Sequence, residues 1–194
     1  GDSALDGVGN RWALTAQPGD RLITLAPRVG QEFGGIEWSP GDARRLLIVG
    51  DETAVPAVRG VLRDLPADAT GAAFLEVPLD ADVLDDVVGP AGVEVTWLPR
   101  NGRPRGVDLH AAVLAHLAAT PAGSAEAEDE EIPETLWETP VYSSLGEEVA
   151  EATQVPTEGS PFPGLYAWIA GESKVVTGLR RALVKDLGID RRQV

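Results

Sequence analysis

Three short loops combine glycine or arginine with charged and hydroxyl side chains directly after an apolar run. They are Gly50–Thr53, the loop beginning at Arg100, and Gly171–Glu172. A glycine at the end of a buried strand lets the backbone turn tightly and approach a ligand closely. Free N–H groups at the start of a following helix bind phosphate oxygens, and so does the planar fork of an arginine. Together, these loops could hold a nucleotide.

The first loop, Gly50–Thr53, has some features that favour phosphate binding and others that oppose it. Thr53 is placed to cap the helix that follows, and Pro56 falls in its first turn, where a missing N–H costs little. Asp51 and Glu52, however, are two carboxylates that would repel a phosphate. The loop also lacks the G-x-G-x-x-G pattern of many dinucleotide sites. By itself, it is as consistent with a structural turn as with a nucleotide cradle.

Arg100 follows an apolar run in the segment Leu98–Arg103. At the carboxyl end of a strand, its fork is well placed for the 2′-phosphate of NADP. The alternative is a solvated loop charge, and the residues alone leave both interpretations open.

These loops must be positioned by strands that alternate with helices. Buried strands are predicted by the apolar runs 46–50, 72–77, 93–98 and 166–170. Helices are predicted by apolar spacing over 54–65, around 82–88, and over 107–119 and 173–187. This alternation predicts an α/β fold, a doubly wound parallel sheet with helices on both faces. The carboxyl ends of its strands would bring the three loops to one edge.

Composition excludes several functional classes. The formal net charge of −15 argues against a nucleic-acid surface, and no apolar run of 18 residues predicts a membrane span. There is no cysteine, and the only histidines, His110 and His116, would face different sides of a helix, so we predict no metal site. The segment 121–165 holds eleven acidic residues and no Lys or Arg, which favours a solvated insertion; docking onto a basic partner is the alternative.

Residues 1–41 differ in character from residues 42–194. They are rich in Gly and Pro, with a turn at 17–20 and an alternating segment at 21–25 that predicts a half-buried strand. A short helix and one strand cannot make a domain. We therefore expect 1–41 to be the end of a domain that begins upstream, and the start at Gly1 to be a cut within a longer chain or a tag remnant.

Three ordered motifs resemble those of the siderophore-interacting proteins, which are FAD-dependent ferric-siderophore reductases related to ferredoxin–NADP reductases. The motifs are GDETAVPA at Gly50–Ala57, VTWLPRNG at Val95–Gly102 and YAWIAGES at Tyr166–Ser173. The stretches Gly7–Ala13 and Pro18–Leu22 resemble the end of that family's flavin-binding β-barrel. The resemblance thus covers nearly the whole chain except the acidic insertion.

The resemblance implies roles for individual residues. The residues expected beside the nicotinamide and pyrophosphate of NADPH or NADH are Gly50, Asp51, Glu52 and Thr53. Gly171 and Glu172 would close the other side, and Arg100 would meet the adenosine phosphate. The residues of the FAD site that this chain contains would be Gly9, Asn10 and Arg11.

The implied reaction is hydride transfer from NAD(P)H to FAD, followed by single-electron transfer to the chelated iron and release of Fe(II). The partners implied are the ferric siderophore and an upstream flavin domain, and the implied location is the cytoplasm. The family's R-x-Y-[ST] flavin motif would precede Gly1, and a Gly-Tyr-Trp strand would follow Val194. We therefore expect this chain alone to bind FAD poorly and to be inactive. Arg180 and Arg181 could hold an anionic siderophore, although surface charge on a helix also explains them.

Three other functions are compatible with parts of the sequence. Gly1-Asp2-Ser3 mimics the nucleophile block of GDS-type esterases, but it follows no buried strand, and Asp108-Leu109-His110 has the D-x-H rather than the D-x-x-H spacing. A non-catalytic binding module could keep the same sheet without its nucleotide. An NAD(P)H–flavin reductase that acts on another acceptor would share every site residue.

Overall fold

The computed structural model describes residues 7–24, 29, 38–43, 45–119 and 161–194. The chain forms two compact units, Gly1–Gly35 and Ile36–Val194. The acidic insertion falls almost entirely outside the described residues.

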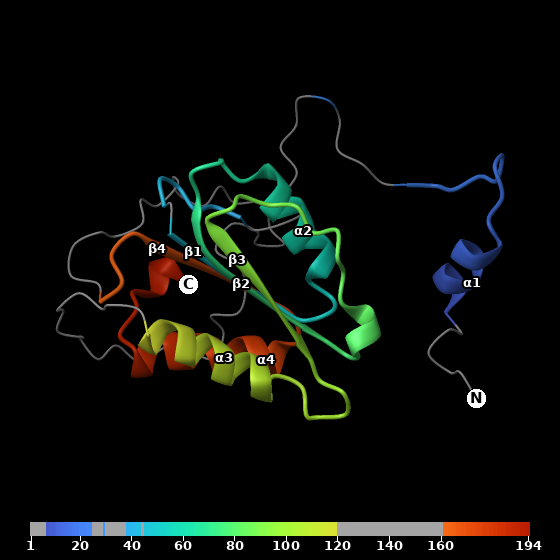
Figure 1. Ribbon diagram of the computed structural model, residues 1–194. Helices are drawn as coiled ribbons and strands as arrows, with labels where there is room; N and C mark the ends of the chain where they lie inside the picture. Colours follow the sequence, from blue (N-terminus) through green and yellow to red (C-terminus); the bar gives the residue numbers. More distant parts are fainter. Residues whose placement is uncertain (1–6, 25–28, 30–37, 44, 120–160) are drawn as a thin grey trace, which may run out of the picture. The chain divides into compact units, whose positions relative to one another are not determined.

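The larger unit is built on a sheet of four parallel strands (Figure 1). They are β1 (Arg45–Gly50), β2 (Thr70–Val77), β3 (Val93–Pro99) and β4 (Leu165–Ala170). Their order across the sheet is β3-β2-β1-β4, and all three pairings are parallel. The four predicted strands are confirmed, and so is the α/β fold class.

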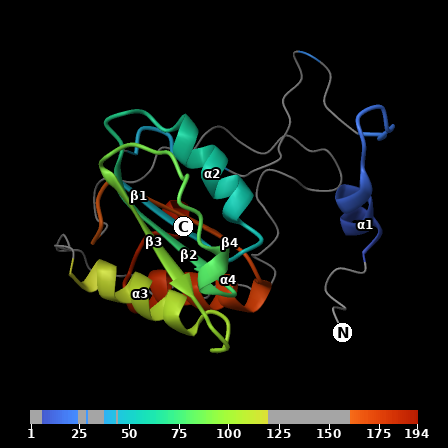
Figure 2. The same ribbon diagram turned by 45° about the vertical axis from the view of Figure 1, so that its right-hand side comes forward.

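Helices cover both faces of this sheet. Figures 1 and 2 show α2 (Val55–Asp64) on one face and α3 (Val107–Ala118) with α4 (Ser173–Arg181) on the other. A π-helical turn, Ala182–Asp186, continues α4, and single 3-10 turns lie at Asp80–Asp82 and Arg191–Gln193. The sheet is therefore doubly wound, as predicted.

Alternate residues of β1 pack into two hydrophobic cores, one on each face of the sheet. Leu46 and Ile48 pack in the cluster that includes α2, whereas Leu47 and Val49 pack in the cluster of α3 and α4. Successive side chains of a strand point to opposite faces, so a strand buried on both sides reads as a continuous apolar run. This is why the continuous apolar run 46–50 predicted a central strand.

The strand order contains a reversal next to β1. The chain runs outward from β1 to β2 and β3, and then returns to place β4 on the other side of β1. Ligands of open α/β sheets bind outside the carboxyl ends of the strands at such a reversal. Here that position is bounded by Gly50 and Ala170, which are partners in the β1–β4 register.

Two predicted elements are wrong. The helix predicted around 82–88 is absent, and only the turn Asp80–Asp82 is helical there. The three β-branched valines in the segment disfavour a helix, and Pro90 ends it. The strand predicted at 21–25 is also absent over the described residues 21–24, where Ile23 is 95% exposed. An alternating pattern makes a strand only where another strand pairs with it.

The smaller unit contributes one helix among its described residues, α1 (Val8–Thr15). No helix in the described ranges has the length and apolarity needed to cross a membrane.

Candidate functional site

Two glycines allow the loops after β1 and β4 to approach each other. A Cβ on Gly171, whose φ is 148°, would lie 2.8 Å from Cγ and Oδ2 of Asp51. A Cβ on Gly50 would lie 2.8 Å from that of Ala54. Neither position has room for a side chain without a shift, and the positive φ of Gly171 adds strain for any other residue. The loop after β1 and the loop after β4 are therefore in close contact at the reversal of strand order.

Asp51 joins these loops directly. Its carboxylate is 1% exposed and accepts hydrogen bonds from Thr53 N at 2.9 Å, Thr53 Oγ1 at 2.6 Å and Glu172 N at 2.8 Å. Glu172 in turn caps α4, because its Oε2 accepts from the backbone N–H groups of Lys174 and Val175. The predicted residues of the first and third loops are thus brought together through one buried carboxylate.

Thr53 does not cap α2 as predicted. The N-cap position is held by Ala54, and no side chain caps this helix. The hydroxyl of Thr53 donates to Asp51 instead. No side chain therefore makes a capping hydrogen bond at the amino end of α2, where helix N–H groups bind phosphate oxygens.

Arg100 lies at the same edge, but its guanidinium is held by two carboxylates. Nη1 lies 2.7 Å from Oε2 of Glu52 and 3.1 Å from Oε2 of Glu76, and Nη2 lies 3.0 Å from Oε1 of Glu52. The Arg100 side chain is 11% exposed. The hydrogen bond from Arg100 is the largest influence on Glu52 and lowers the pKa of its carboxyl; the same bond raises the pKa of Arg100.

Sequence reasoning missed Glu76 and Arg105. Glu76 is fully buried near the end of β2, where its two oxygens accept from Gly106 N at 2.9 and 3.0 Å. Arg105 Nη2 pairs with Glu52 Oε1, and its Nη1 lies 3.9 Å from Oδ2 of Asp51. A single charged residue inside the apolar run 72–77 was the available signal for Glu76, because a buried carboxylate needs partners.

The remaining predicted residues lie elsewhere. Arg180 and Arg181 are in the last turn of α4, roughly 10 Å along the axis from its start at the carboxyl edge. The Arg180 side chain has a buried Nε without a hydrogen-bond partner in the described residues, and burial lowers the pKa of this guanidinium. Gly9, Asn10 and Arg11 all fall in α1, in the smaller unit.

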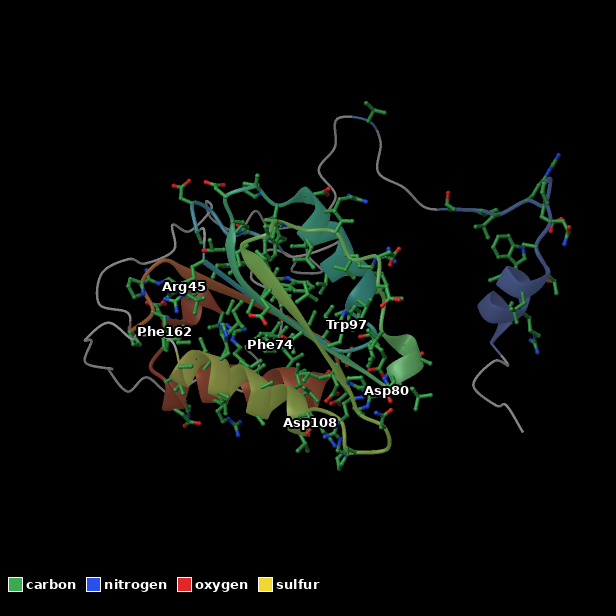
Figure 3. All side chains as sticks on the ribbon, viewed as in Figure 1. Arg45, Phe74, Asp80, Trp97, Asp108 and Phe162 are labelled. Atoms are coloured by element: carbon green, nitrogen blue, oxygen red, sulfur yellow. The ribbon has the colours of Figure 1, made fainter. Side chains whose placement is uncertain are left out.

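The two ends of the sheet differ in their side chains. In Figure 3, Asp80 and Asp108 lie toward the carboxyl end of β3, whereas Arg45 and Phe162 lie at the opposite end of the sheet. Asp108 pairs with Arg103 at 3.0 Å, and Asp80 exchanges hydrogen bonds with Asn101 at 3.3 and 3.0 Å. The carboxyl edge thus gathers the acidic and basic side chains of three loops.

A parallel sheet with helices on both faces and linked loops at its strand reversal defines a domain of the doubly wound α/β class. The sequence model of the siderophore-interacting proteins matches residues 43–194, and the chain belongs to this family. All three motifs that carried the resemblance lie within that range. The family prediction is therefore confirmed.

Individual relatives match shorter segments. An uncharacterised protein of Mycobacterium tuberculosis is 38% identical over 97 residues, which are 50% of this chain and 32% of the relative. The ferric vibriobactin reductase ViuB of Vibrio cholerae is 34% identical over 93 residues, which are 48% of this chain and 32% of that protein. These matches thus span about a third of the length of each relative.

Solved structures extend the likeness over more of the chain. A siderophore utilization protein from T. fusca is similar with a TM-score of 0.52 and 29% sequence identity. The match covers 97% of this chain and 53% of that one.

Proposed function

We propose that this chain is the NAD(P)H-binding part of a flavin-dependent reductase that releases iron from ferric siderophores. The observation that carries the proposal is the buried link between Asp51, Thr53 and Glu172 at the strand reversal of a siderophore-interacting protein. The ferric reductase activity named for ViuB supports the same reaction class. Residues 1–41, with Gly9–Arg11, would form the end of the upstream flavin-binding barrel.

The residues at the carboxyl edge fit a dinucleotide. Gly50 and Gly171 let the backbones of the two loops come close without a side chain at either position, and the uncapped start of α2 offers N–H groups to the pyrophosphate. Asp51 would fix the distance between the two loops that flank the nicotinamide, and Glu172 would hold the start of α4 beside it. Bound FAD would accept the hydride and pass single electrons to the iron, which is the chemistry the protein itself does not supply. Because the reaction draws on NAD(P)H, we place the protein in the cytoplasm.

Calorimetric titration of this chain with NADH and with NADPH tests the proposal. We expect at least one of them to bind with a Kd between about 1 μM and 1 mM, the range in which enzymes usually hold such substrates. Gly171→Val should abolish binding, since its side chain would displace Asp51. Gly60→Ala is the matched control, because Gly60 lies in α2 with no atom within 4 Å of an added Cβ. A folded chain that binds neither nucleotide at millimolar concentration contradicts the proposal.

A further inference from the structure

Opposite charges meet where this class of sheet recognises the adenosine of a dinucleotide. An acid near the end of the second strand accepts from the ribose 2′-hydroxyl of NAD, whereas an arginine nearby accommodates the 2′-phosphate of NADP. This chain places both at that position, with Glu76 near the end of β2 and Arg100 directly after β3. Which nucleotide fits therefore depends on what these side chains already bind.

The arginines of the loop after β3 are already paired. Arg100 binds Glu52 through two nitrogens and also contacts Glu76. Arg105 binds Glu52 as well, at Oε1. Arg103 pairs with a carboxylate on α3 and donates to two backbone carbonyls of its own loop. A phosphate that binds Arg100, whose side chain is 11% exposed, would have to displace a carboxylate from its guanidinium.

The charge of the cluster also opposes a phosphate. Three carboxylates, Asp51, Glu52 and Glu76, face two guanidinium groups, Arg100 and Arg105, so the cluster has a formal charge of −1. The lowered pKa of Glu52, caused first by its hydrogen bond with Arg100, keeps this carboxyl ionised at neutral pH. A phosphate monoester carries a charge between about −1.5 and −2 at pH 7, whereas a ribose hydroxyl is neutral and donates to a carboxylate.

Glu52 is the only one of the two glutamates that a ligand could reach directly. Its side chain is 26% exposed, whereas Glu76 is fully buried and its oxygens accept from Gly106 N and Arg100. A hydroxyl could therefore approach Glu52 without breaking the ion pairs behind it. A phosphate would break them.

We propose that Glu52, by occupying Arg100 and Arg105, makes this domain select NADH over NADPH. The inference rests on the proposed function, since it assumes that a pyridine nucleotide binds at this edge. Glu52 is thus a specificity-determining residue, and Glu76 positions Arg100 behind it.

The test compares ligands that differ only in the 2′-phosphate. The wild-type chain is titrated with NADH and NADPH, and with the fragments 5′-AMP and adenosine 2′,5′-bisphosphate. We expect NADH to bind at least about tenfold more tightly than NADPH, because the 2′-phosphate must break a charge-assisted hydrogen bond between Arg100 and Glu52, and one such bond is worth that much or more. Glu52→Gln should raise the affinity for NADPH and the bisphosphate by roughly tenfold, since it removes the repelling charge and weakens the hold on both arginines.

Glu94→Gln is the matched control. It removes one exposed carboxylate near the amino end of β3, and we expect no change in the NADH-to-NADPH ratio. NADPH binding as tightly as NADH to the wild type, or an unchanged ratio in folded Glu52→Gln, overturns the inference while the proposed function stands. If Glu52→Gln does not fold, the wild-type ratio for the two fragments decides the question alone. If no nucleotide binds at all, the proposed function fails and the inference fails with it.

Discussion

Removing Arg100 should destabilise the fold even without any nucleotide. In Arg100→Met, the carboxylate of Glu76 would stay buried with only the N–H of Gly106 as its partner. Breaking a buried ion pair from one side costs about 3–5 kcal/mol, because the remaining charge has lost its compensation. Methionine keeps much of the apolar stem, so lost packing adds little. For a domain of this size, the loss corresponds to a fall in Tm of roughly 6–20 °C.

The assay is urea unfolding followed by tryptophan fluorescence, with circular dichroism in parallel. Arg59→Met is the control, since Arg59 pairs with Asp86 at a similar distance of 2.8 Å but the two side chains are 41% and 72% exposed. Exposed pairs contribute about 0–1 kcal/mol, so this variant should stay close to the wild type.

A second substitution separates charge from packing. Adding Glu76→Gln to Arg100→Met removes the uncompensated charge and keeps an amide oxygen that accepts from Gly106 N. We expect the double variant to be more stable than Arg100→Met by about 2 kcal/mol, because matched removal of both charges is often nearly neutral. The reasoning is refuted if Arg100→Met lies within about 1 kcal/mol of the wild type, or if Glu76→Gln makes it worse.

Three further predictions concern other parts of the fold. Gly171→Ala should lower the free energy of unfolding by about 1–3 kcal/mol in chemical denaturation, because the φ of Gly171 is 148° and the added Cβ would meet the buried carboxylate of Asp51. Gly60→Ala, in the helix α2, should instead raise the free energy of unfolding by up to about 1 kcal/mol, because alanine favours a helix more than glycine does. The pKa of Glu52 is held below its ordinary value of 4.5, mainly by the hydrogen bond from Arg100, so the unfolded chain takes up that proton first. Stability should therefore fall as the pH drops below about 4.5, and less steeply in Glu52→Gln. Gln193→Ala should lower Tm by at least about 2 °C, because the buried amide donates to two backbone carbonyls at 2.8 and 2.9 Å; an unchanged Tm would show that this tie is dispensable.

The positions of the loops could be predicted from sequence, because they depend on local signals. Each predicted strand is an apolar run that ends at or near glycine or proline, and parallel strands end at the same edge of a sheet. This placed Gly50, Arg100 and Gly171 together without any knowledge of their contacts.

The partners of the side chains could not be predicted in the same way. Arg100 binds Glu52 and Glu76, which lie 48 and 24 residues away in the sequence, and nothing in the spacing distinguishes these acids from others. Thr53 had two possible acceptors, the start of α2 and Asp51, and only the folded geometry decides between them. The prediction of a helix at 82–88 failed for a related reason, since apolar spacing carries no information on how strongly valines resist the helix.

The buried charge in β2 calls for an explanation other than stability. Replacing a buried ion pair with apolar residues is often neutral or stabilising, so stability alone does not account for the pair of Glu76 and Arg100. The carboxylate of Glu76 links the end of β2 to the loop after β3. It accepts hydrogen bonds from Arg100, at the start of that loop, and from Gly106 N, directly before α3. Gly106, with a φ of 81°, also lets Val175 of α4 approach so closely that a Cβ there would lie 2.8 Å from its Cγ2. One buried carboxylate thereby holds the loop that carries three arginines against α4, the helix that Glu172 caps. Rigid placement of that kind is useful at a ligand-binding edge, and it is the reason we assign Glu76 a positioning role and Glu52, in front of it, the discrimination between nucleotides.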